Sequence, residues 1–148
     1  MTIELDVQRA TSFQPLPTDL QFELWVTTAL QKRSAAVLTI RIADREECRA
    51  LNKRFSGKDK ATNVLSFPAS LPGEIALPLL GDIVLCAPMV AEEALRQEKS
   101  PEAHWSHLTI HGVLHLLGYD HQQAEAAAEM EALEIDLLQS LGFPSPYE

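Results

Sequence analysis

Hydrophobic residues along the chain follow two periods, and each period predicts a different kind of element. Alternation of apolar and polar positions, as at Ile3, Leu5 and Val7, is typical of a half-buried strand. This alternation, or a short β-rich run, predicts strands over residues 3–7, 36–43, 64–67, 74–76 and 81–87.

Helices are predicted where apolar residues recur every three or four positions and where capping residues mark the ends. Thr18 or Asp19 can cap a helix over residues 20–32, with Leu20, Leu24, Thr27, Ala29 and Leu30 along one side. A short helix follows Asp44. Further helices are predicted over residues 88–99, 101–117 and 122–141; the first two begin at a proline, and a glycine ends the second.

The order of these elements indicates the fold class. No internal repeat or linker interrupts the 148 residues, a length that suits one domain with a buried core. Strands and helices follow one another without strict alternation, which favours an α+β architecture around one sheet. We therefore predict a single α+β domain over residues 1–148.

Composition narrows the possible partners and compartments. The 12 basic and 21 acidic residues leave a formal charge of −9, which disfavours non-specific binding to phosphate backbones. Cys48 and Cys86 are too few for a disulfide framework, and we expect two buried thiols in a reducing cytoplasm. The most apolar segment, residues 75–91, is interrupted by proline, glycine and aspartate, so no membrane span is expected. The protein is predicted to be cytoplasmic.

The segment HGVLHLLGYDH carries the clearest chemistry. Residues four apart share a helix face, so His111 and His115 can direct two imidazoles to one point. Gly118 permits the left-handed backbone that ends a helix, and the chain can then return His121 to the same point. Three imidazoles with one open position are the arrangement of a catalytic zinc site. The spacing therefore predicts one metal ion, for which zinc is favoured although imidazole also suits copper, iron and nickel.

The same segment matches the metzincin protease pattern H-E-x-x-H-x-x-G-x-x-H at its three histidines and its glycine. It departs from that pattern at Gly112, which replaces the glutamate that serves as general base in those proteases. We therefore expect a zincin-like metal helix without the peptide-cleaving carboxylate. The residues that act as general acid and base stay unassigned.

Three neighbouring residues could support the ligands. His107 lies on the same helix face, where it either supports the site or substrate, or is a buried hydrogen-bonding side chain. His104, one turn earlier, could likewise support the site or contact the substrate, but we expect it at the surface. Asp120 could orient the His121 imidazole through its second N–H group, or it could cap the following helix.

A basic loop precedes the short strand predicted over residues 64–67. Residues 52–60, NKRFSGKDK, hold four cations and one aspartate, a local charge of +3 in an otherwise acidic chain. Arginine and lysine bind phosphate oxygens well, so Arg54, Lys58 and Lys60 are candidate phosphate contacts. A charged loop of this kind can also be merely solvated.

The segment HLTIHGVLHLLGYDH, residues 107–121, closely resembles the signature of the YbeY family of bacterial metal-dependent endoribonucleases. GKDKATNVLSFP, LGDIVLCAP and EMEALEIDLLQSLGFPSPY agree with that family as well. The chain departs from the family pattern at Ser56, where the family has arginine, and at Ala61, where it has proline. Arg54 could replace the missing arginine if the loop is extended.

This resemblance implies a small mixed sheet flanked by helices and one zinc ion held by His111, His115 and His121. It also implies cleavage of single-stranded RNA, 3′-end maturation of 16S ribosomal RNA and a role in ribosome quality control. Unstacked RNA fits such a site because its phosphates and 2′-hydroxyls are accessible. The expected partners are single-stranded RNA, the ribosomal RNA precursor and the small ribosomal subunit, without a membrane.

Two other functions stay open. Ser56 in place of arginine favours a ribosome-associated RNA-binding assembly factor whose zinc is structural. A metal hydrolase of another substrate, such as a peptide, would use the same zinc chemistry, but Gly112 counts against it.

Overall fold

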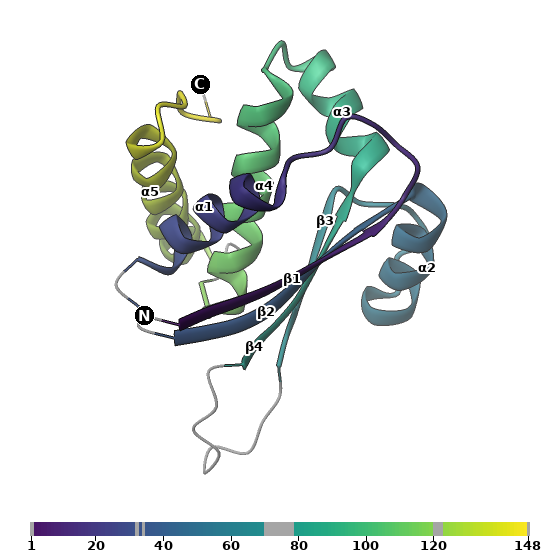
Figure 1. Cartoon of the computed structure of the whole chain (residues 1–148), viewed down its shortest axis with the longest axis horizontal. Coiled ribbons are helices and arrows are strands. Elements are labelled where there is room, and N and C mark those ends of the chain that lie inside the picture. The colour runs from purple at the N-terminus through teal and green to yellow at the C-terminus, as the bar shows by residue number, and fades with distance from the viewer. Residues whose placement is uncertain (1, 32, 34, 70–78, 120–122, 148) are drawn as a thin grey trace.

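The computed structural model describes residues 2–31, 33, 35–69, 79–119 and 123–147. Figure 1 shows a sheet with helices on both faces, so the predicted α+β class is confirmed. The elements in these residues are β1 (Thr2–Ala10), α1 (Asp19–Leu30), β2 (Ala35–Ala43), α2 (Arg45–Ser56), β3 (Val64–Pro68), β4 (Leu79–Cys86), α3 (Ala87–Arg96), α4 (Pro101–Leu116) and α5 (Ala124–Ser140). The strand predicted over residues 74–76 lies outside the described residues.

The sheet is mixed, as the family resemblance implied, and its strand order is β1-β2-β4-β3. β1, β2 and β4 run parallel, and β3 lies antiparallel to β4 at the edge. Successive side chains of a strand face opposite sides, so Ser66 and Phe67 of β3 point to different faces of the sheet. Gly81 permits the tight pairing at this edge, because a Cβ atom there would lie 2.1 Å from the Phe67 carbonyl oxygen.

The main core lies between the sheet and the layer that contains α1, α4 and α5. α4 occupies its centre and packs against β3, β4, α1, α3 and α5. Most of its residues are therefore buried, although its outer side still carries histidines. α2 covers part of the opposite face over a smaller cluster that includes Cys48 and Cys86, both buried as predicted.

The ends of α4 follow the signals in the sequence. Pro101 occupies its first turn, and the Ser100 hydroxyl accepts a hydrogen bond from the Ala103 amide at 3.1 Å. Gly118 follows the helix with a φ of 101°, a conformation that glycine adopts without steric cost. The cap at Ser100 and the glycine after the helix thus fix the two ends of α4, and with them the positions of its histidines along the helix.

Only part of the apolar side predicted for α1 is buried: Ala29 and Leu30 are buried, but the two leucines before them are not. Leu20 and Leu24 are 76% and 53% exposed, whereas Phe22 and Trp25 are buried. The two aromatic rings meet edge to face at 5.6 Å, and Phe22 makes the same kind of contact with Trp105 of α4 at 6.1 Å. Aromatic rings bury more apolar surface than leucine, so they determine which side of α1 faces the core.

No helix in the described part of the chain is long and apolar enough to cross a membrane.

Candidate metal centre

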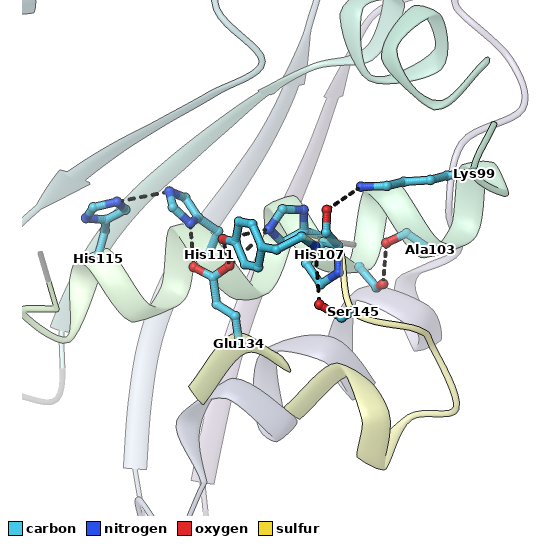
Figure 2. A network of polar contacts seen from close by, with 10 residues as sticks. Lys99, Ala103, His107, His111, His115, Glu134 and Ser145 are labelled. Atoms are coloured by element: carbon cyan, nitrogen blue, oxygen red, sulfur yellow. Dashed lines mark hydrogen bonds and ion pairs between the residues drawn. The ribbon is translucent and has the colours of Figure 1, made fainter. Parts of the chain in front are cut away.

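The histidines of α4 lie along one side of the helix, and Figure 2 shows Glu134 reaching them from α5. The Nε2 atoms of His111 and His115 are 3.0 Å apart. Two nitrogens bound to one tetrahedral zinc ion would be separated by about 3.3 Å. The two imidazoles are thus hydrogen-bonded to each other, at a spacing close to the one that a shared ion would require. His121 and Asp120, the other predicted participants, lie outside the described residues.

Glu134 is completely buried and accepts three hydrogen bonds. Its carboxylate lies 2.6 Å from His111 Nδ1, 3.0 Å from His107 Nε2 and 2.6 Å from the hydroxyl of Tyr147. Burial alone would raise the pKa of Glu134, but hydrogen bonds from His107 and His111 outweigh it and hold that pKa at about 2. Glu134 is thus an ionised carboxylate inside the core.

The ionised carboxylate determines how His111 is protonated. Because Glu134 can only accept, the Nδ1 atom of His111 carries the proton and donates it. The Nε2 atom of a neutral His111 then offers its lone pair toward His115. A carboxylate behind the ligand imidazole is the usual support of a zinc-bound histidine. This arrangement therefore fits a metal ion on the Nε2 side of His111.

A second group of potential ligands overlaps the first. His107, His111 and Glu134 offer ligand atoms that all lie within 4.8 Å of one another and could hold a metal ion. However, the contact of 2.6 Å between His111 and Glu134 has the length of a charge-assisted hydrogen bond and is shorter than the spacing between two zinc ligands. As the side chains stand, this second group is a hydrogen-bond network.

Gly112 packs where a metzincin carries its catalytic glutamate. A Cβ atom at this position would lie 3.0 Å from Cγ2 of Ile83 and 3.3 Å from the hydroxyl oxygen of Ser66. Ser66 also donates a hydrogen bond of 3.1 Å to the Gly112 carbonyl, which draws β3 close to α4. The sheet therefore occupies the space that a glutamate side chain would need.

His104 is not at the surface, contrary to the prediction. It is 3% exposed, and its Nε2 atom lies 2.8 Å from the Glu93 carboxylate. Glu93 also accepts a hydrogen bond of 3.0 Å from the Asn63 amide. Burial lowers the pKa of His104, although its contact with Glu93 opposes this shift. His104 thus links α4 to α3, and through Glu93 to Asn63 just before β3.

The basic residues lie at the end of α2 and in the loop after it. Arg54, Lys58 and Lys60 are exposed, and no described carboxylate lies within ion-pair distance of any of them. By contrast, Arg49 pairs with Asp59 at 2.7 Å. The three predicted phosphate contacts therefore carry positive charges that the described chain does not neutralise.

The structure also shows why Arg54 does not replace the arginine absent at position 56. Both positions are helical, so their side chains project about 200° apart. The Ser56 hydroxyl donates to the Asn52 carbonyl at 2.8 Å, and the Asn52 amide donates to the Lys60 carbonyl at 2.9 Å. Asn52 thus holds the loop against α2, and Ser56 bonds to Asn52 within the helix.

Sequence reasoning missed Glu134 and Tyr147. A signal for Glu134 exists, since Met130, Glu134 and Leu138 recur four residues apart and all three are buried. A carboxylate in the apolar stripe of a helix needs a buried partner, and five histidines were available. Nothing in the sequence indicates that Tyr147, after the last helix, returns to this carboxylate.

Comparison with known proteins identifies the family. A family model described as endoribonuclease YbeY matches residues 8–142, which include His107, His111, His115 and Glu134. A solution structure of TM1509 from Thermotoga maritima has a similar fold, with a TM-score of 0.57 and 20% sequence identity over 93% of this chain and 91% of that chain. Membership of the matched family implies an endoribonuclease that acts in ribosomal RNA processing. The chain therefore belongs to the YbeY endoribonuclease family.

Proposed function

We propose that the chain is a zinc-dependent endoribonuclease that cleaves single-stranded RNA in the cytoplasm, during 3′-end maturation of 16S ribosomal RNA and ribosome quality control. The observation that supports this most strongly is the convergence of His111 Nε2 and His115 Nε2 at 3.0 Å, with Glu134 hydrogen-bonded behind His111. The expected partners are the ribosomal RNA precursor and the small ribosomal subunit.

In this proposal His111, His115 and His121 hold one zinc ion, and no protein side chain takes the fourth position. The donor set fits zinc because neutral imidazole nitrogens are among its preferred ligands. A zinc ion held there supplies Lewis-acid polarisation of a phosphoryl oxygen and activation of water near neutral pH. Glu134 keeps the His111 ring in one tautomer and one orientation, because it accepts the Nδ1 proton.

RNA contacts are assigned to the basic residues of α2 and its loop. Arg54, Lys58 and Lys60 offer unneutralised charges, which suit phosphate oxygens. An overall charge of −9 makes a local basic surface necessary for any polyanionic substrate. Gly112 supports RNA rather than peptide as the substrate, because the position of the protease base is filled by Ile83 and Ser66.

The test is cleavage of a labelled single-stranded RNA by the purified full-length protein, with a double-stranded RNA and a peptide panel in parallel. We expect cleavage of the single strand only, its loss after chelation and its return when zinc is restored. His115→Ala should cut at background rate, whereas Leu95→Ala, a change at an exposed site on α3, should cut like wild type.

Two results would contradict the proposal. Unchanged cleavage by His115→Ala would remove the metal role. A folded, zinc-loaded wild-type protein that binds but never cuts RNA would instead favour the assembly factor with a structural zinc ion.

A further inference from the structure

An aromatic ring lies exposed at the end of α2, on the face of the sheet opposite α4. Phe55 is 59% exposed, and a ring of this size is usually covered in a folded protein. Its centroid lies 4.9 Å from that of Phe67 on β3, with the ring planes at 61°. The Arg54 guanidinium carbon lies 5.3 Å from the Phe55 centroid. Two rings and a cation thus form one surface cluster.

A cavity of about 460 Å³ adjoins these rings, a size typical of sites for small organic groups. It lies between α2 and the sheet. Leu51, Phe55 and Phe67 contribute apolar walls, and Thr39, Arg41 and Asp82 contribute polar groups. The guanidinium of Arg41 is already bound to Glu47, at 2.9 Å for the Nη2 atom. The pocket therefore combines ring faces with hydrogen-bonding groups and has no free cation of its own among these residues.

From this arrangement we infer that Phe55 and Phe67 form a stacking subsite for one nucleobase of a single-stranded RNA. This inference rests on the proposed ribonuclease function. The Asp82 carboxylate would repel a phosphate in the pocket but can accept hydrogen bonds from the amino group of a base. Arg54, at the rim, can contact the phosphate of the same nucleotide. Stacking on aromatic side chains beside a basic surface is the general way in which proteins hold single strands.

The edge strand connects this subsite with the proposed metal centre. Ser66 of β3 faces α4, where it bonds the Gly112 carbonyl, and Phe67 is the next residue on the opposite face. A single strand that crosses the β3 edge can therefore place one nucleotide near His111 and another on Phe55. The subsite would hold a base a few nucleotides from the scissile bond.

The test measures binding of a fluorescent, single-stranded 2′-O-methyl oligonucleotide by anisotropy, with gels to confirm that it stays intact. We expect Phe55→Ala to weaken binding roughly 5- to 150-fold, the range for loss of one stacked base. Phe55→Trp should bind like wild type, and Phe55→Leu should bind like Phe55→Ala. Leu95→Ala removes a comparably exposed apolar side chain from α3 and should change nothing.

A series of oligonucleotides with one abasic position each identifies the stacked nucleotide. At one position, removing the base should weaken binding to the wild-type protein by the same factor as Phe55→Ala. Combining that abasic oligonucleotide with the Phe55→Ala variant should weaken binding little more than either change alone. Wild-type affinity in Phe55→Ala or Phe55→Leu would overturn the inference, as would an equal effect at every abasic position. If these variants still cleave RNA in a metal-dependent way, the proposed ribonuclease function is unaffected by that result.

Discussion

Glu134 Oε1 lies 2.6 Å from His111 Nδ1, so the two nitrogens of one imidazole have separate roles. Nδ1 is held by a buried carboxylate, while Nε2 faces the Nε2 atom of His115 at 3.0 Å. The same carboxylate accepts hydrogen bonds from His107 and Tyr147, which fixes its own orientation. His111 is thereby oriented by residues from three parts of the chain.

Replacing Glu134 by Gln should weaken zinc binding about 10- to 100-fold, the usual effect of losing the partner of a ligand imidazole. The glutamine amide lacks the negative charge that favours the proton on His111 Nδ1. Its N–H group would also face side chains that donate hydrogen bonds to Glu134. Competition with a chromophoric chelator measures the affinity. Glu131→Gln, on the exposed side of the same helix, is the matched control, and equal affinities in the two variants would contradict the role of Glu134.

Replacing Tyr147 by Phe should lower the free energy of unfolding by roughly 1 kcal/mol, because one hydrogen bond to a buried carboxylate is lost. The Tyr147 ring is partly exposed, which keeps the effect small. Zinc affinity should fall less than in Glu134→Gln, since the bond to His111 remains. Urea denaturation measures the free energy of unfolding, and chelator competition measures the zinc affinity. A larger loss of zinc affinity in Tyr147→Phe than in Glu134→Gln would contradict this prediction.

Introducing the metzincin glutamate through Gly112→Glu should destabilise the fold by about 1–3 kcal/mol. The new side chain would meet Ile83 and Ser66, which already lie within 3.3 Å of the position of its Cβ atom. We expect a lower thermal midpoint and no hydrolysis of peptides. Wild-type stability with new peptidase activity would show that this position has room for a catalytic base.

Removing one cation of the basic surface should change the salt dependence of RNA binding. Arg54→Gln, Lys58→Gln and Lys60→Gln should each weaken binding and lower the slope of log affinity against log salt by about 0.7, the value for one phosphate contact on a single strand. Arg96→Gln removes a cation that lies 3.8 Å from Glu92 on α3, and its slope should equal that of wild type. Unchanged slopes in all three variants would show that the loop is merely solvated.

The sequence predicts the part of the centre that depends on local spacing. His111 and His115 are four residues apart, and the caps of α4 are local signals, so their placement follows from helix geometry. Glu134 and Tyr147 reach His111 only through the packing of α5 and the last residues against α4, which no local pattern encodes. The spacing of Met130, Glu134 and Leu138 can indicate that Glu134 is buried, but its pairing with His111 and the return of Tyr147 are visible only in the folded chain.

The other differences between prediction and structure also arise from packing between elements that are distant in the sequence. Leu20 and Leu24 lie on the predicted apolar side of α1, but which part of the helix is buried depends on Trp105 in a distant helix. His104 was expected in solvent because its partner, Glu93, belongs to α3. Each misplaced side chain is one whose environment is provided by another element.

The zinc content of purified wild type, His115→Ala and His107→Ala, determined by elemental analysis after loading and dialysis, tests the central claim most directly. With zinc bound by His111, His115 and His121, wild type should retain about one ion per chain, His107→Ala should retain most of it and His115→Ala almost none. Full zinc in His115→Ala together with its loss in His107→Ala would contradict this assignment and place the ion among His107, His111 and Glu134 instead.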